Sequence, residues 1–310
     1  MKIFDAQKVY PTLYVQFQSF LDDKSEFVVC KIFENINEYI SGFTFPSNEQ
    51  ERQKFLLNVL QRLFNAESLL AKNWKSHKLF FESLEKSFQF FNSDQIWKFI
   101  FPLCKKAVKS ASIPTKVVLA RLLCLILCQI VDKGSRIEFH EYIKSLVIFG
   151  TSIERIFFFD FVGGIYKKIS KHYFRENFLD FIYSLAESEK VPSVLIKLCN
   201  SAELIRRFIL LDDEINGTKV LKMYELIFKK NNILSIKEKA NDALQLLKSE
   251  NFIDSLNDLD EGKLTLQEKE IYLKEKKANE EQKKKEIEAL INHAKQEYQP
   301  ANKVAKVIYQ

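Results

Sequence analysis

The feature that most constrains the fold is an internal repeat. When the sequence is shifted against itself so that Pro114 falls on Pro192, two long stretches match in the order of their apolar residues. The aromatic pair at 80–81 then falls on the pair at 158–159. Within each copy the apolar residues lie three or four positions apart, which is the period of a helix. The repeat therefore predicts helices that recur at a fixed interval.

Glycine and proline are scarce. The chain of 310 residues has 7 glycines and 6 prolines, about a third of the usual share. Sheet proteins need glycine in their hairpin turns, and dinucleotide-binding folds need a glycine-rich turn. With 46% hydrophobic residues and 28 phenylalanines, the sequence predicts an all-α protein with a phenylalanine-rich core.

Periodicity and helix-start signals predict the positions of the helices, which fall in pairs. The predicted pairs are 4–21 with 25–41, 73–91 with 93–109, 115–131 with 136–148, 152–170 with 173–188, 193–209 with 214–230, and 234–248 with a short partner. A further helix near 48–66 has no assigned partner. Each pair has one apolar face that it cannot bury alone, so neighbouring pairs are expected to stack. Half of the repeat, about 39 residues, is the length of one HEAT or armadillo unit, and the sequence predicts an α-solenoid of this type.

We expect two regions, with the repeats in 1–250 and a charged helical extension in 251–310. Glutamate and lysine are mixed through 268–288, with favourable i,i+4 pairs. The apolar residues there do not keep a heptad pattern for the three or four heptads of a coiled coil. A single solvated helix is favoured over a dimerising coiled coil, and the tail 299–310 is expected to be disordered.

Three stretches carry a resemblance to a known family: Asn73-Trp74-Lys75-Ser76-His77, Ile100-Phe101-Pro102-Leu103 and Phe149-Gly150-Thr151-Ser152. They resemble HEAT repeats of serine/threonine phosphatase scaffold and regulatory subunits, most closely regulatory subunit 4 of protein phosphatase 4. The similarity covers roughly residues 70–210. It implies a solenoid that holds a phosphatase catalytic subunit.

The chain also departs from that family. The repeats of that family often have Asp and Arg after the proline-containing turn, and these residues form a ladder between units. The corresponding residues here are Lys116-Val117-Val118 and Ser193-Val194-Leu195. We therefore expect that ladder to be missing.

Candidate partner-binding residues lie mainly in the turns within each predicted pair, which line one ridge in scaffolds of this type. Trp74 is added because tryptophan is enriched at interface hot spots, although core packing is the alternative for it. Ordinary solvated turns are the alternative for the others. The candidates are Trp74, Asp94, Lys133, His172 and Asp213.

Catalytic, cofactor and metal sites are not predicted. The sequence has no phosphate-binding glycine loop, nucleophile elbow or zinc-protease motif, and its four histidines are scattered. Cys124 and Cys128 share a helix face inside an apolar run, where buried hydrophobic packing is favoured over metal ligation.

The charge and hydropathy patterns also limit the partners. The net charge is +6, and much of the lysine lies beyond position 250, which is not the concentrated basic surface of a nucleic-acid binder. The sequence has no run of 18 apolar residues, so it predicts no membrane span, and no signal peptide is evident. The expected location is cytoplasmic.

The sequence leaves three function classes open. The first is a non-enzymatic scaffold or regulatory subunit that binds a protein phosphatase catalytic subunit or other proteins. The second is a HEAT-repeat adaptor in transport or in cytoskeletal or ciliary assembly. The third is an enzyme with an unrecognised site, for which the sequence offers least support.

Overall fold

The computed structural model describes residues 15–42, 49–165, 168–169, 171–208 and 214–248, together with a few residues between 277 and 291. Regular secondary structure in these residues is helical throughout, with no strand. The prediction of an all-α protein is therefore confirmed. Most of the expected extension at 251–310 lies outside the described residues, and its described residues, among them Ile287 and Ile291, are helical and exposed.

Residues 15–21 form a helical segment that precedes the labelled elements. The elements that follow are α2 (Glu26–Glu34), α3 (Ile36–Gly42), α4 (Glu49–Leu70), α5 (Trp74–Ser87), η1 (Phe88–Phe90), α6 (Ser93–Gln95), η2 (Ile96–Ile100), α7 (Phe101–Ser110), α8 (Ile113–Gln129), α9 (Lys133–Ile148), α10 (Ser152–Ile165), α11 (Lys171–Phe174), η3 (Arg175–Leu179), α12 (Asp180–Ser188), α13 (Pro192–Asn200), α14 (Ala202–Phe208), α15 (Glu214–Lys230) and α16 (Leu234–Lys248).

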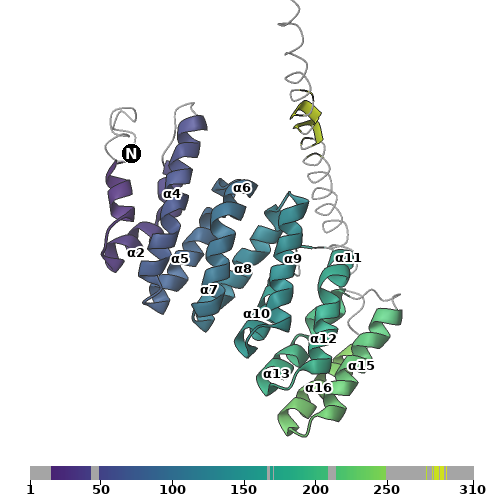
Figure 1. Cartoon of the computed structure of the whole chain (residues 1–310). Coiled ribbons are helices and arrows are strands. Elements are labelled where there is room, and N and C mark those ends of the chain that lie inside the picture. The colour runs from purple at the N-terminus through teal and green to yellow at the C-terminus, as the bar shows by residue number, and fades with distance from the viewer. Residues whose placement is uncertain are drawn as a thin grey trace, which may run out of the picture.

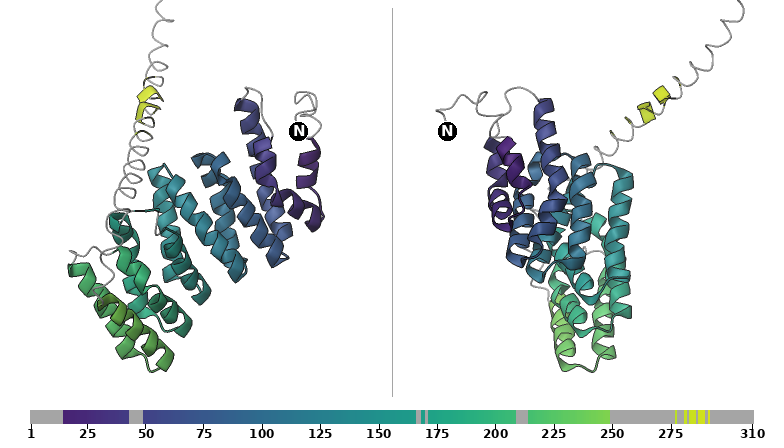
Figure 2. Two further views of the ribbon diagram at one scale, coloured as in Figure 1. Left: turned by 180° about the vertical axis from the view of Figure 1, so that it is seen from behind. Right: turned by 60° about the vertical axis from the view of Figure 1, so that its left-hand side comes forward.

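The helices form two layers, and the chain alternates between them. We call α2, α5, α8, α10, α13 and α16 the first layer, because each packs against the next in that order. The second layer contains α4, α7, α9, α12 and α15, which lie in the same order beside it (Figures 1 and 2). The helix expected near 48–66 without a partner is α4, which contacts both α2 and α5. It therefore takes a regular place in the second layer.

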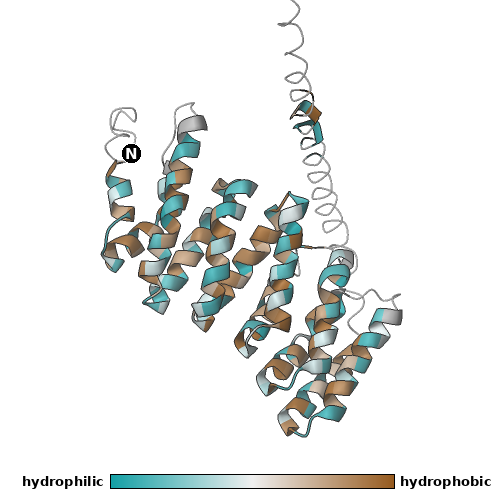
Figure 3. Ribbon diagram, viewed as in Figure 1, coloured by the Kyte–Doolittle hydropathy of each residue, from teal (hydrophilic) through white to brown (hydrophobic). Residues whose placement is uncertain are grey.

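The core lies between the two layers and runs along the whole described array. Phenylalanine rings in contact with one another join its successive parts. Phe101 of α7 lies 5.5 Å from Phe139 of α9, which lies 5.9 Å from Phe161 of α10. Phe161 in turn lies 5.7 Å from Phe178 of η3. Hydrophobic residues are dense along α8 and α10 (Figure 3), because these first-layer helices have neighbours on several sides.

The structural elements recur near the interval that the sequence shows. The N-cap of α5 is Asn73, and the residue that the repeat aligns with it, Thr151, immediately precedes α10. In the second layer, both η2 (Ile96–Ile100) and η3 (Arg175–Leu179) are single π-helical turns. Such turns are rare within α-helices, and the starts of these two agree with the repeat to within one position. The two copies thus share an unusual backbone feature as well as an apolar pattern.

The adjacent glycines of α10 have different roles. From the sequence, we interpret Gly163 and Gly164 as a place where two helices approach closely. A Cβ atom on Gly164 would lie 2.7 Å from the Sγ atom of Cys124 in α8, which is closer than real contacts allow. A Cβ atom on Gly163 would meet only Leu204, at 4.0 Å. Close approach therefore explains Gly164 and leaves Gly163 unexplained.

Candidate interaction surface

The turns between helices lie on two opposite edges of the array. Consecutive helices are antiparallel, so their connections alternate between the edges (Figure 1). We define the lower edge by the turns that precede the first-layer helices: 22–25, 71–73, 111–112, 149–151, 189–191 and 231–233. The upper edge contains the starts of α6, α9 and α11, and the start of α15 follows the same order.

The five candidate binding residues do not form one site. Asp94 and Lys133 are exposed at the starts of α6 and α9, on the upper edge. His172 lies in α11 on the same edge, and its side chain is outside what the structure describes, as is the whole of Asp213. Trp74 starts α5 at the lower edge. Helix α5 has 14 residues and separates the two edges by about 20 Å, so Trp74 does not share a compact site with Asp94 and Lys133.

The lower edge has a row of exposed apolar side chains near the starts of the first-layer helices. The exposed fractions are 72% for Phe27, 50% for Trp74, 69% for Ile113, 85% for Phe149 and 69% for Leu234. Single exposed apolar residues are ordinary on protein surfaces. Here they recur at nearly every first-layer helix, and we call this row the apolar ridge.

The sequence contains a signal for the apolar ridge that helical periodicity misses. Trp74, Ile113, Ile153 and Pro192 follow one another at nearly equal intervals, each close to half of the repeat. Each lies in the first turn of its helix, and Pro192 is exposed like the others. Periodicity within a helix assigns such residues to the core, whereas their position at the helix start places them on the edge.

Lysines lie beside the apolar ridge. The exposed lysines in or next to the lower-edge turns are Lys24, Lys72, Lys75, Lys109, Lys190, Lys229 and Lys230. The ammonium group of Lys75 lies 5.8 Å from the centre of the Trp74 ring. Of the acidic groups nearby, Asp22 is paired with Arg62 at 2.9 Å. The first-layer helices also turn their N-termini, which are positively polarised, toward this edge.

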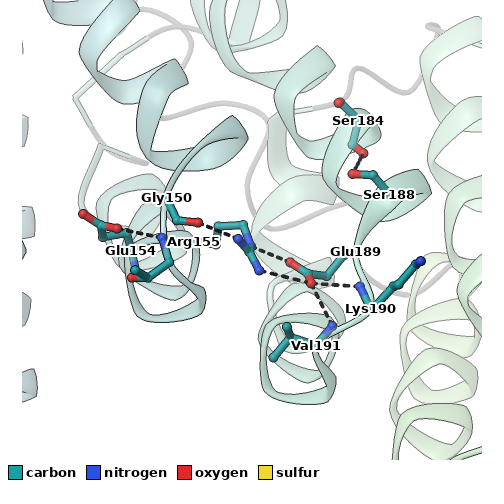
Figure 4. Close-up of polar contacts among 9 residues, drawn as sticks. Gly150, Glu154, Arg155, Ser184, Ser188, Glu189, Lys190 and Val191 are labelled. Atoms are coloured by element: carbon teal, nitrogen blue, oxygen red, sulfur yellow. Dashed lines mark hydrogen bonds and ion pairs between the residues drawn. The ribbon is translucent and has the colours of Figure 1, made fainter.

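One ion pair fixes the turn between α12 and α13 (Figure 4). The Nε atom of Arg155 lies 2.6 Å from Oε2 of Glu189, and its Nη1 donates to the carbonyl oxygen of Gly150 at 2.6 Å. Glu189 Oε1 accepts from the backbone N–H groups of Lys190 and Val191, both at 2.8 Å. The Glu189 side chain is 3% exposed. The starts of α10 and α13 are therefore held together at the lower edge.

Two further contacts join neighbouring helix starts on this edge. Ser76 Oγ in α5 donates to Glu26 Oε1 in α2 at 2.7 Å. Glu154 in α10 accepts from the Thr151 N–H at 2.7 Å and attracts the buried Lys116 ammonium of α8. Burial lowers the pKa of Lys116, and the charge of Glu154 opposes that shift. Together with the Arg155–Glu189 pair, these contacts link the start of α2 to that of α5, the start of α8 to that of α10, and the start of α10 to that of α13.

A second buried polar group lies between α4, α5 and α7. Glu67 is 1% exposed, and its Oε1 lies 3.1 Å from His77 Nε2 while its Oε2 lies 2.7 Å from Lys106 Nζ. Burial would raise the pKa of the Glu67 carboxyl, but the hydrogen bonds and charges of His77 and Lys106 outweigh it and lower the pKa. The Glu67 carboxylate therefore links three helices.

Ion pairs bridge neighbouring helices or the turns beside them, although the Asp–Arg ladder of the resembled family is absent at 116–118 and 193–195. They use other residues, well separated in the chain: Asp22–Arg62, Glu67–Lys106, Glu85–Arg121, Lys105–Glu138, Arg155–Glu189 and Asp160–Lys197. Adjacent units are thus joined by polar contacts at other places than the family pattern suggests.

The buried cysteines have the properties of packing residues. Burial raises the pKa values of the Cys104 and Cys124 thiols, and that of Cys199 to about 12. Thiols with such pKa values stay protonated and are poor nucleophiles and ligands. Within the described ranges, no group of three or more His, Cys, Asp or Glu residues is arranged to hold a metal ion. None of the helices described is both long and apolar enough to span a membrane.

Comparison with known proteins adds no family assignment. No protein-family model matches the chain, and a search of curated proteins returned no match. The function is therefore argued from the repeat, the two edges and the resemblance of residues 70–210.

Proposed function

We propose that the chain is an α-solenoid of HEAT or armadillo type that acts as a non-enzymatic scaffold or regulatory subunit of a serine/threonine protein phosphatase. The observation that supports this most is the apolar ridge. Solenoids present long continuous surfaces that bind other proteins. A row of exposed Phe, Trp, Ile and Leu side chains along such a surface has the composition of an interface.

The contacts between units also suit a scaffold. The Arg155–Glu189 pair and the Glu67 group each join helices of neighbouring units. Such contacts fix the spacing between consecutive helix starts, and therefore the spacing of the exposed side chains. A scaffold accelerates a reaction between its partners by raising their effective concentration, which needs a defined geometry and no catalytic residues of its own.

The choice of a phosphatase rests on the resemblance of residues 70–210 to phosphatase subunits. The alternative, an adaptor in transport or in cytoskeletal or ciliary assembly, uses the same surfaces and differs in its partner. The identity of the bound protein therefore distinguishes a phosphatase subunit from an adaptor.

Affinity purification tests this proposal. The tagged full chain, purified from the cells that naturally contain it, is expected to recover a serine/threonine phosphatase catalytic subunit, detected by mass spectrometry and by dephosphorylation of a phosphopeptide. Recovery of tubulin or transport proteins without phosphatase would favour the adaptor. Recovery of neither class would remove support from both.

Paired variants then identify the edge that binds. Trp74→Ala with Ile113→Ala changes the lower edge, and Asp94→Ala with Lys133→Ala changes the upper edge. All four side chains are exposed, so neither pair is expected to unfold the chain. The proposal predicts that the lower-edge pair reduces phosphatase recovery more than the upper-edge pair does.

A further inference from the structure

The lower edge combines three features that select the same kind of ligand. It has the apolar ridge, a row of exposed lysines that includes Lys72, Lys75 and Lys109, and the N-termini of the first-layer helices. Lysine side chains and helix N-termini both attract carboxylates. Exposed Phe, Trp, Ile and Leu side chains attract apolar groups.

Several helix starts on this edge lack side-chain caps. The N-cap residues Ser25 of α2, Ser112 of α8 and Val191 of α13 make no side-chain hydrogen bond to the first turn. The N–H groups of a first helical turn lack a partner four residues earlier in the helix and need one from outside. In α8 and α13 the first turn has one such group fewer, because Pro114 and Pro192 have no N–H. Carboxylate oxygens bound at helix N-termini satisfy such groups.

The spacing of the ridge determines the shape of the ligand. Packed helices lie about 10 Å apart, so the six first-layer helix starts span about 50 Å. A chain in the extended polyproline II conformation advances about 3.1 Å per residue and has three residues per turn, so a segment of about 16 residues covers the edge. One side chain in three then faces the edge, and these side chains meet successive helix starts.

We propose that the lower edge binds an extended acidic segment of a partner protein, in which apolar side chains recur about every third residue between Asp and Glu. The apolar side chains contact the ridge from Phe27 to Leu234, and the carboxylates contact the lysines and the uncapped helix starts. This inference rests on the proposed scaffold function and names the chemistry of the bound partner.

An anionic membrane also attracts lysines and apolar residues, but the geometry favours a peptide. Membrane-bound surfaces usually gather their apolar residues on one continuous helix face. Here the apolar side chains come from different helices and are separated by polar turn residues, including the cap residues Asn73 and Thr151. A ligand with alternating apolar and acidic side chains matches that pattern.

Fluorescence anisotropy with a synthetic probe tests the proposal. The probe is a labelled peptide made of five Phe-Asp-Glu repeats, titrated with the purified full chain. A matched peptide has Ser in place of each Phe, and a second has Lys in place of each acidic residue. We expect the Phe-Asp-Glu peptide to bind and both matched peptides to bind at least tenfold more weakly. No binding, or equal binding of the Ser peptide, overturns the proposal.

Variants place the peptide on the lower edge. Trp74→Ala with Ile113→Ala, and Lys72→Glu with Lys75→Glu, are each expected to weaken binding at least tenfold. The controls are Leu57→Ala with Ile137→Ala and Lys86→Glu with Lys133→Glu, which change exposed residues of the same kinds away from the lower edge. These controls are expected to change the affinity less than twofold. Equal losses in both sets overturn the assignment.

Other occupants of the edge are measured with the same variants. Sedimentation velocity reports self-association, and co-sedimentation with phosphatidylserine vesicles reports membrane binding. If either depends on Trp74 and Ile113 while the peptide does not bind, the ridge serves a second copy or a membrane and the proposal fails. Peptide binding without phosphatase recovery supports the partner chemistry and counts against the phosphatase assignment. Phosphatase recovery without peptide binding does the reverse.

Discussion

The two copies of the repeat keep the same backbone register and use different polar contacts. His77 and Arg155 are aligned by the repeat, each four positions after the residue that precedes its helix, Asn73 or Thr151. His77 contacts Glu67, toward the N-terminus, whereas Arg155 contacts Glu189, toward the C-terminus. Equivalent positions therefore hold neighbouring units together in opposite directions along the chain. The repeat specifies where helices start, and individual residues specify how each joint is stabilised.

We call the contacts of Glu67 with His77 and Lys106 the first joint, and the pair of Arg155 with Glu189 the second joint. The largest expected effect on stability is at the second joint. Glu189→Ala leaves Arg155, whose side chain is 19% exposed, without its carboxylate partner and removes the acceptor of two backbone N–H groups. Arginine cannot lose its charge to relieve the burial. We expect a loss of about 3 kcal/mol in the free energy of unfolding, measured by urea denaturation. A loss below about 1 kcal/mol, the size of an ordinary surface pair, would show that the pair is not structurally important.

The first joint is expected to be less sensitive. Glu67→Ala removes a buried carboxylate, but Lys106, whose side chain is 49% exposed, can turn to water. We expect a loss of about 2 kcal/mol in the same measurement. If this loss exceeded that of Glu189→Ala, the ranking of the two joints would be reversed.

Acidification is expected to destabilise the region around His140 at a higher pH than the region around Glu67. Burial, with help from the charge of Arg136, lowers the pKa of His140 to about 4, while the charge of Glu141 opposes the shift. The unfolded chain binds this proton below about pH 6.5, so folding stability is full above that pH and falls between about pH 6.5 and 4. We expect the free energy of unfolding to fall by about 1–2 kcal/mol between pH 7 and pH 5.

The first joint responds at lower pH. The pKa of Glu67 is lowered, so its contribution is present above the unfolded value of about 4.3 and is lost as the pH falls below it. Hydrogen exchange is measured at pH 7 and 5 and expressed as protection factors, which correct for the slower intrinsic exchange of amides at pH 5. Protection is expected to fall around His140 and to change little around Glu67. His140→Gln should remove much of the loss of stability between pH 7 and 5, and an equal fall in protection in both regions would contradict this separation.

The adjacent glycines of α10 are expected to give effects of opposite sign, the smaller of them at Gly163. Gly164→Ala places a methyl group against Cys124, and overpacking of this kind costs about 1–3 kcal/mol. Gly163→Ala adds a methyl group in ordinary contact with Leu204 and is expected to stabilise the helix by up to about 1 kcal/mol. Thermal unfolding midpoints should move in opposite directions. A shift in the same direction would contradict the close approach of α8 and α10.

Local sequence signals predict much of the helical framework. The expected helix at 234–248 coincides with α16, and the one at 115–131 agrees closely with α8. Apolar periodicity, cap residues and prolines act over a few positions, so a single sequence shows them. The absence of strands in the described residues follows from the same local signals and the low glycine content.

The joints and the edges could not be predicted in the same way. Arg155 and Glu189 are 34 positions apart in the chain, and nothing local shows that they meet. The sequence selects Trp74 because tryptophan is enriched at interface hot spots, and it selects Asp94 and Lys133 because they lie in turns. The alternation of layers places Trp74 on the opposite edge from the other two, and that alternation is a property of the packed array.

The most direct test of the interaction surface is a hydrogen-exchange footprint of the full chain, with and without the phosphatase subunit recovered in the purification. Our account predicts protection at the starts of α5, α8 and α10, around Trp74, Ile113 and Ile153, with little change at the starts of α6 and α9. Protection confined to the starts of α6 and α9, or no protection on either edge, would contradict it.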